Sequence, residues 1–157
     1  MFTFLTGGAG VAGGTAGRTP RLSKAEYETL AAFRYALRRF LAFSEAAANK
    51  GGLLPQQYQA LLAVKGSARG DTISIAELAR QLIIKHNSAV GLVDRMELEG
   101  LVVREAAVTD LRKVNIRLTP KGTRLLQRLA ATHRAELRRI GPELNKLLAS
   151  LSKRTRP

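Results

Sequence analysis

Cysteine and tryptophan are both absent from the 157 residues, and only 5% of the residues are aromatic. Without cysteine the chain has no disulfide, no thiolate metal site and no thiol-based redox switch. The two histidines, His86 and His133, stand far apart and have no companion at metal-ligand spacing, so we expect neither a metal nor a cofactor. The chain also lacks a Ser/His/Asp arrangement, a phosphate-cradling glycine loop and paired carboxylates. We therefore expect that the protein is not an enzyme.

Long apolar runs are missing as well. No stretch is apolar for long enough to span a bilayer, which predicts a cytoplasmic protein without membrane contact. Residues 1–17 hold six of the fourteen glycines and have no basic start, so a signal peptide is not expected. We interpret residues 1–22 as a flexible Gly/Ala-rich extension, and a wrongly assigned start codon is the alternative.

Acidic residues are scarce: twelve Asp and Glu stand against 26 Lys and Arg, for a net charge of +14. The excess is uneven. Residues 71–122 carry only +1, whereas residues 1–70 carry +6 and residues 123–157 carry +7. The basic flanks either attract a polyanion over long range or are a solvated surface. Charge alone does not locate a binding element.

Two short amphipathic segments stand between residues 75 and 100. Ile75, Leu78, Ala79 and Leu82 form one helical face, and Ser74 with Glu77 forms a capping-box pattern before it. The second segment carries a stripe of Ala89, Leu92, Val93 and Met96, and Gly100 ends it. Helices joined by so short a turn must cross, which predicts a helix-turn-helix. Ile83 lies where many such turns use glycine.

The following residues predict a β-hairpin wing at about 101–119. The stretches 101–106 and 114–119 are rich in β-forming residues and flank a polar tip at 108–113. A short strand at Thr72-Ile73 is expected to join the hairpin as a third strand. Thr119 and Pro120 then have the pattern of an N-cap followed by proline at the first helical position. The predicted fold class is mainly α (α+β), with a winged helix-turn-helix core.

This stretch resembles the DNA-binding core of the MarR family of bacterial transcriptional regulators. The resemblance rests on four motifs in order: Glu77-Leu78-Ala79; Leu92-Val93-Asp94-Arg95-Met96-Glu97 with Gly100-Leu101-Val102; Asp110-Leu111-Arg112; and Leu118-Thr119-Pro120-Lys121-Gly122. It extends more loosely over residues 23–152 and excludes the first twenty. Residues 153–157 are interpreted as a basic tail.

The flanking segments predict two long helices, at about 23–48 and 120–152. Ser23 and Glu26 form a capping-box pattern at the start of the first, and a further helix is expected to open at Pro55. In the last segment, Gly141-Pro142 is expected to end one helix and start another. Both segments carry apolar stripes that the rest of the chain is too small to cover. We expect a homodimer through these helices, as the resemblance also implies, and an intramolecular helix pair is the alternative.

The predicted DNA contacts lie on the second helix of the helix-turn-helix and on the wing. In this motif the exposed face of the second helix enters the major groove. Asn87 either pairs with adenine or caps the helix, and Arg95 either reaches a phosphate or pairs with Asp94 or Glu99. Gly91, where family members commonly carry a polar or basic residue, either admits the backbone to the groove or is merely tolerated. The candidates on this helix are Lys85, His86, Asn87, Ser88, Val90, Gly91 and Arg95.

On the wing, the resemblance implies that Arg112 enters the minor groove. Asp110 either holds that arginine or hydrogen-bonds the hairpin backbone. Lys113 and Arg104 are candidates for phosphate contact, with solvated strand positions as the alternative.

The functional hypothesis is a dimeric regulator, acting as a repressor on a pseudo-palindromic operator in double-stranded DNA. The resemblance implies release by a small aromatic or phenolic effector between the dimer helices and the reading head. Phe40 and Tyr58 are candidates for that pocket, and core packing is their alternative role. The alternative function is a winged-helix module that coats DNA without sequence preference or binds another protein.

Overall fold

The computed structural model describes residues 21–68, 70–107 and 110–152, without the side chains of residue 107 and of residues 110–113. The predicted extension up to residue 20 and the basic tail at 153–157 lie outside this description. The elements are α1 (Lys24–Lys50), α2 (Pro55–Lys65), β1 (Thr72–Ser74), α3 (Ile75–Leu82), α4 (His86–Leu98), β2 (Val102–Ala107), β3 (Asp110–Leu118) and α5 (Pro120–Ser152).

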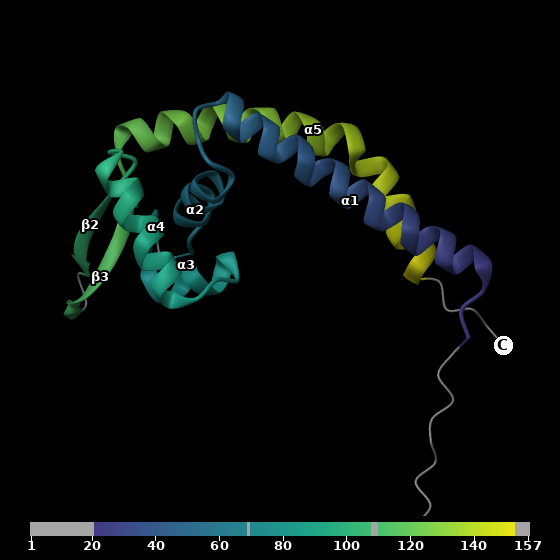
Figure 1. Cartoon of the computed structure of the whole chain (residues 1–157), viewed down its shortest axis with the longest axis horizontal. Helices are drawn as coiled ribbons and strands as arrows, with labels where there is room; N and C mark the ends of the chain where they lie inside the picture. The colour runs from purple at the N-terminus through teal and green to yellow at the C-terminus, as the bar shows by residue number, and fades with distance from the viewer. Residues whose placement is uncertain (1–20, 69, 108–109, 153–157) are drawn as a thin grey trace, which may run out of the picture.

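The molecule has two parts, which Figure 1 shows clearly. Helices α1 and α5 lie side by side in opposite directions and form a long arm. The head, consisting of α2, α3, α4 and the three strands, sits at the end where α1 finishes and α5 begins. The predicted winged helix-turn-helix fold is confirmed.

The strands form an antiparallel sheet in the order β1-β3-β2. Ile73 pairs with Ile116, so the short strand at residues 72–74 joins the wing as predicted. Arg104 of β2 pairs with the same Ile116 from the other side. The predicted tip at 108–113 is too long, because Asp110 already belongs to β3. Cross-strand pairing extends the ladder beyond the apolar alternation that marks a strand in the sequence.

The core lies where the head helices pack against the sheet. The predicted stripe on α4, which consists of Ala89, Leu92, Val93 and Met96, is fully buried. Leu92, Val93 and Met96 of this stripe join Leu78 of α3, Ile73 of β1 and Ile116 of β3 in one apolar cluster. Because these side chains leave water together, their burial sets the crossing of α3 and α4.

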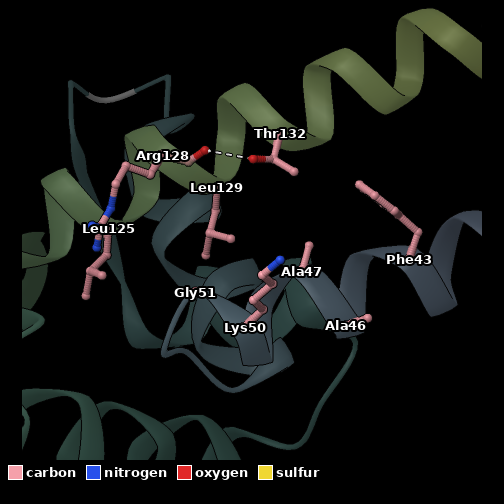
Figure 2. A pocket seen from close by; sticks show the side chains of 9 residues that line it. All are labelled: Phe43, Ala46, Ala47, Lys50, Gly51, Leu125, Arg128, Leu129 and Thr132. Atoms are coloured by element: carbon pink, nitrogen blue, oxygen red, sulfur yellow. Dashed lines mark hydrogen bonds between the residues drawn. The ribbon is translucent and has the colours of Figure 1, made fainter.

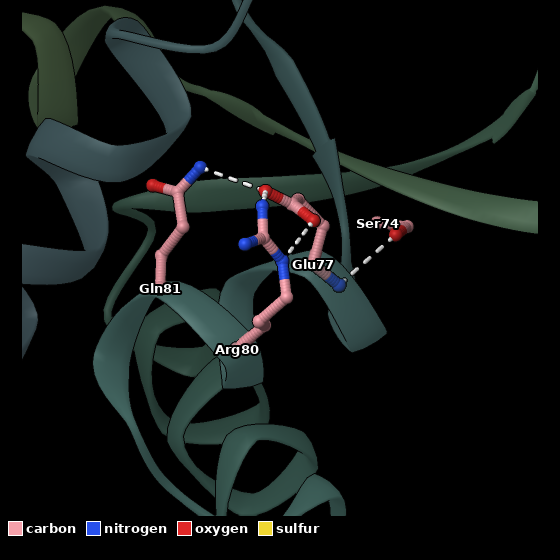
Figure 3. Close-up of polar contacts among 4 residues, drawn as sticks. All are labelled: Ser74, Glu77, Arg80 and Gln81. Atoms are coloured by element: carbon pink, nitrogen blue, oxygen red, sulfur yellow. Dashed lines mark hydrogen bonds and ion pairs between the residues drawn. The ribbon is translucent and has the colours of Figure 1, made fainter.

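Local hydrogen bonds set the helix starts. The Ser23–Glu26 capping box forms: Ser23 Oγ accepts the Glu26 N–H at 3.3 Å, and Glu26 accepts the Ser23 N–H at 2.7 Å. Ser74 Oγ caps α3 by accepting the Glu77 N–H at 3.2 Å. The Glu77 carboxylate also receives Arg80 Nε at 2.9 Å and Gln81 Nε2 at 3.0 Å, so one side chain ties together the first two turns (Figure 3).

Helix α4 ends at Gly100 as predicted. Gly100 has φ +67°, and its N–H donates to Glu97 O at 2.9 Å, while the Leu101 N–H donates to Met96 O at 2.8 Å. These two bonds form a Schellman motif, which needs a residue that tolerates positive φ.

Helix α5 begins in direct contact with this C-terminus. Thr119 Oγ1 accepts the Gly122 N–H at 3.0 Å, as the predicted N-cap, and donates to Gly100 O at 2.6 Å. A Cβ on Gly122 would stand 2.1 Å from Leu101 O. Gly122 therefore allows the arm to approach the head at backbone distance.

The predicted break at Gly141-Pro142 is wrong, because α5 continues through Pro142 to Ser152. A residue before proline is pushed out of the helical region by contact between its Cβ and the proline ring. Gly141 has no Cβ, so this contact does not arise. Pro142 has no N–H, so the Arg138 carbonyl loses its helical partner, and both residues are exposed.

Candidate nucleic-acid interface

Helix α4 presents a polar outer face. Asn87, Ser88, Asp94 and Arg95 are exposed, and Val90 and Gly91 are half-buried at its edges. Lys85 and His86 are exposed where the helix begins. All seven candidates of this helix thus lie on or beside the face opposite the buried stripe. Their contacts with DNA stay a prediction.

The N-terminus of α4 has no side-chain cap. Lys85 is the N-cap residue and makes no side-chain capping bond, and Asn87 lies inside the first turn. The alternative role of Asn87 as a helix cap is therefore wrong. The first turn contains no acidic residue. Its N–H groups and the positive end of the helix dipole remain available to an anion such as a phosphate.

Arg95 folds back along the helix toward Gly91. Its Nη1 atom lies 3.6 Å from the position that a Cβ on Gly91 would occupy. Both carboxylates proposed as its alternative partners are engaged elsewhere: Asp94 pairs with Arg104, and Glu99 accepts from Gln57. Within the described ranges Arg95 forms no ion pair, so its guanidinium charge is available on the outer face.

Arg104 joins the wing to α4. Its Nη2 lies 2.5 Å from Asp94 Oδ1, its Nη1 donates to Glu97 Oε2, and its backbone N–H donates to Glu97 Oε1 at 3.1 Å. Partial burial opposes the charged form, but the hydrogen bonds to Asp94 and Glu97 outweigh it and raise the pKa of Arg104. The structure thus gives this guanidinium two carboxylate partners, whereas the sequence suggested a phosphate contact.

The rest of the wing is described only in part. The backbone of Asp110, Arg112 and Lys113 belongs to β3, and their side chains lie outside the described structure. Their predicted roles in the minor groove stay predictions. Arg117, farther along β3, pairs with Glu105 of β2 at 2.5 Å, and its hydrogen bond lowers the pKa of that carboxyl.

The structure adds contacts between the head elements that the sequence did not indicate. Buried Gln57 of α2 donates to Glu99 Oε2 at 2.8 Å, and Lys121 of α5 donates to Glu99 O at 2.7 Å. These contacts hold the C-terminus of α4 from two sides. Gln57 and Glu99 are 42 residues apart in the sequence, and Glu99 and Lys121 are 22 residues apart. No local spacing pattern indicates such pairs.

The two candidates for an effector pocket meet at a buried histidine. His133 of α5 stacks on Tyr58 of α2, with ring centroids 4.3 Å apart, and meets the edge of Phe40 of α1 at 6.3 Å. His133 Nδ1 donates to Leu129 O at 2.7 Å, so Nε2 accepts from Ser44 Oγ at 2.8 Å. Burial raises the pKa of Tyr58. Tyr58 belongs to the core, which was its alternative role, and the cluster joins the arm to the head.

The described residues hold no group of three or more His, Asp and Glu side chains that could bind a metal ion. None of their helices is long and apolar enough to cross a membrane.

The curated proteins whose sequences are similar to this chain include transcriptional regulators. The sequence model of the MarR family matches residues 51–113. The HTH-type transcriptional regulator FarR of Neisseria gonorrhoeae is 31% identical over 81 residues, which are 52% of this chain and 53% of FarR. The chain spans about half the length of the curated relatives it matches.

Solved structures share the fold over most of the chain. AbsC, a MarR family transcriptional regulator from Streptomyces coelicolor, is 25% identical with a TM-score of 0.68, covering 85% of this chain and 94% of AbsC. A probable transcriptional regulator from Pseudomonas aeruginosa is 28% identical with a TM-score of 0.55, covering 75% and 92%. Together with the crossing of α3 and α4 beside a two-stranded wing, these likenesses show that the chain is similar to MarR family transcriptional regulators, in sequence over residues 51–113 and in fold over most of its length.

Proposed function

We propose that the protein is a sequence-specific DNA-binding transcriptional regulator that inserts α4 into the major groove. The observation that carries the proposal is the outer face of α4. It is polar and uncapped at its N-terminus, and it carries an arginine without an ion-pair partner in the described structure. Asn87 and Ser88 are the candidates for base edges, and Lys85, His86 and Arg95 for phosphates. Arg112 and Lys113 extend the contact to the neighbouring minor groove.

The protein acts as a homodimer in this proposal. The arm leaves large apolar side chains in water: Tyr27, Leu30, Leu37 and Leu41 on α1, and Leu137 and Leu148 on α5. Tyr27 is 60% exposed and Leu41 is 53% exposed, which is unusual for a row of such residues on one surface. A second arm packed on this row would present two α4 helices to half-sites about one helical turn apart on a pseudo-palindromic operator. Leu41→Glu should give monomers in analytical ultracentrifugation.

The proposal includes repression that is relieved by a small aromatic or phenolic anion. Phe40 of the arm and Tyr58 of the head contact the same His133, so these rings link the two parts. A ligand that separated them would alter the angle between head and arm, and with it the spacing of the two reading helices. To release the operator, such a ligand would have to bind the conformation whose reading helices are wrongly spaced more tightly than it binds the conformation that fits the operator.

A second candidate function is a DNA-coating module without sequence preference. The distribution of charge favours it: the basic excess lies on the flanking segments, and residues 71–122 are nearly neutral. A coater of this kind binds through phosphate neutralisation and counterion release, so its affinity falls steeply with salt.

Fluorescence anisotropy separates the two functions. The purified full chain is titrated into the duplex upstream of its own gene and into a scrambled duplex, each at low and at physiological salt. A regulator binds its own upstream duplex selectively and retains that preference at physiological salt. Equal binding to both duplexes that collapses with salt would overturn the regulator in favour of the coater.

A further inference from the structure

Helix α5 is strongly basic, with seven Lys and Arg residues against two Glu residues. All seven cations are exposed. Glu136 pairs with Arg139, and Glu136 and Glu143 both line a hollow between α1 and α5. The two carboxylates therefore lie on the side of α5 that turns toward α1. The other six cations form no ion pair with any residue that the structure describes.

These six cations share one side of the helix. At about 100° per residue, their positions fall within about 140° of the circumference of α5. The buried residues Leu126, Leu129 and His133 lie on the opposite side, where they pack against the head. The cations therefore point away from the head. We call this side the outer face of α5, and its cations are Lys121, Arg124, Arg128, Arg134, Arg138 and Lys146.

The outer face of α5 has neither a carboxylate nor a large apolar side chain. Its other exposed positions are Gln127, Ala131, Ala135, Pro142, Asn145 and Ala149. A basic helix that lies on a membrane needs Trp, Phe or Leu side chains that enter the lipid, and this face offers none. A nucleic-acid backbone needs only cations at its phosphates. The composition of the face thus favours a nucleic acid over a membrane.

The start of the outer face is hollowed. A hollow of about 510 Å³ is lined by Lys121, Arg124, Leu125, Gln127 and Arg128. All five belong to α5, so the hollow has no second wall and cannot enclose a small ligand. Figure 2 shows the guanidinium of Arg128 beside Leu125, so this side chain extends toward the start of α5. An open cationic surface of this kind fits the backbone of an extended polyanion.

The outer face of α5 is remote from the N-terminus of α4. The start of α5 is bonded to the other end of α4: Lys121 Nζ donates to Glu99 O at 2.7 Å, and Thr119 Oγ1 donates to Gly100 O at 2.6 Å. The 13 residues of α4 extend over about 20 Å. In Figure 1, α5 runs along the top of the molecule and α3 lies at the bottom of the head. A duplex that receives the N-terminus of α4 in its major groove therefore leaves the outer face of α5 uncovered.

We propose that the outer face of α5 binds the phosphate backbone of a second DNA duplex. Residues 121–146 extend over about 38 Å, which is close to one helical turn of B-DNA at about 34–36 Å. Each phosphate that a cation neutralises releases counterions, so this binding depends on salt and not on sequence. With α4 on an operator, the protein joins two segments of DNA. Binding at the outer face is independent of the proposed function, whereas the joining of two segments rests on it.

Fluorescence anisotropy with a scrambled duplex tests the outer face in a chain whose α4 is disabled. Ser88→Glu places a carboxylate on the exposed side of α4, where it repels phosphate. Protein with this substitution should still bind the scrambled duplex at low salt. Adding Arg124→Gln and Arg128→Gln should weaken that binding at least about tenfold. It should also reduce the slope of log affinity against log salt concentration by about 1.8, which is about 0.9 for each cation removed.

The matched control adds Lys24→Gln and Lys65→Gln to Ser88→Glu instead. It removes the same net charge, but from exposed cations that already pair with Glu28 and Asp71. Affinity for the scrambled duplex should stay within about twofold of that of Ser88→Glu alone. Circular dichroism confirms that each variant is folded.

A capture experiment tests whether the protein joins two duplexes. The upstream duplex is fixed to beads, and the full chain and a fluorescent scrambled duplex are added. Wild-type protein should retain the fluorescent duplex on the beads. Protein with Arg124→Gln and Arg128→Gln should lose most of this capture, while its anisotropy on the upstream duplex changes less than about twofold. Capture that survives both substitutions would mean that two reading helices join the duplexes, and would overturn the joining role of α5.

The inference is also overturned if Ser88→Glu protein does not bind the scrambled duplex at low salt, or if the Arg124/Arg128 variant binds it as tightly as the Lys24/Lys65 control. Binding of this protein to phosphatidylglycerol–phosphatidylcholine vesicles but not to the scrambled duplex would assign the face to a membrane and overturn it as well. Selective binding of the upstream duplex by wild-type protein reports the proposed function separately. That selectivity can fail while Ser88→Glu protein still binds the scrambled duplex, and the reverse.

Discussion

Arg104 on β2 and Asp94 on α4 form an ion pair, with Nη2 2.5 Å from Oδ1. The same guanidinium also holds Glu97, one turn of α4 farther on. A wing strand thus helps to fix the rotation of α4 about its own axis. Exposed ion pairs add little to stability, but this side chain is only 27% exposed and its value lies in the orientation it imposes.

Arg104→Ala should weaken operator binding about tenfold, or about 1.4 kcal/mol, because α4 loses its fixed angle to the wing. Anisotropy on the upstream duplex measures the change. Arg117→Ala is the matched control, because Arg117 pairs with Glu105 inside the wing and does not reach α4. If the two variants lose equal affinity, Arg104 does not act through α4.

Arg112→Ala should also weaken operator binding at least about tenfold, since a guanidinium in a narrow minor groove meets strong negative potential. The dimer should persist, because residue 112 lies on the wing and the exposed apolar row lies on the arm. Anisotropy and analytical ultracentrifugation of the same sample check both statements. Unchanged affinity would remove the wing from the mechanism.

Ile83→Asn should raise the free energy of unfolding by about 1 kcal/mol, because a β-branched residue pays to adopt the left-handed conformation that asparagine tolerates. Ile83 has φ +55° and ψ +45° and is 92% exposed, so no packing is lost with its side chain. Urea unfolding followed by circular dichroism gives the value.

Leu98→Asn provides the control for that measurement. Leu98 is 89% exposed but lies in the last turn of α4 with helical geometry. The same exchange of an exposed apolar side chain should therefore bring no gain there. A similar gain in stability from Ile83→Asn and from Leu98→Asn would mean that replacing an exposed apolar side chain by a polar one causes the effect. It would contradict the explanation by backbone conformation.

Gly122→Ala should lower the free energy of unfolding by about 2 kcal/mol or more, because its Cβ would overlap the Leu101 carbonyl, which is backbone and has little room to shift. Gly91→Ala should instead raise stability by up to about 1 kcal/mol through helix propensity. There the new methyl group meets only the flexible end of Arg95 at 3.6 Å. Thermal or urea unfolding of the Gly122→Ala and Gly91→Ala variants measures both changes. A loss of stability in both variants would contradict this account of Gly122.

The order of elements was predictable because each depends on local patterns. The buried stripe of α4, the Ser23 and Thr119 caps and the stop at Gly100 all follow from residues within a few positions of one another. The same locality explains the wrong break at Pro142. Gly141-Pro142 has the local pattern of a helix break, but the missing Cβ of Gly141 lets the helix continue through Pro142.

The sequence by itself determined the winged helix-turn-helix, the face of α4 that turns outward and the cationic character of the flanks. Only the tertiary structure decided which charges remain available on that face. Asp94 forms an ion pair with Arg104, and Glu99 accepts a hydrogen bond from Gln57. Arg95 therefore has no carboxylate partner among the described residues. Such pairs form between residues far apart in the chain, so they depend on how the elements pack in three dimensions, and no spacing along the sequence indicates which side chains then meet.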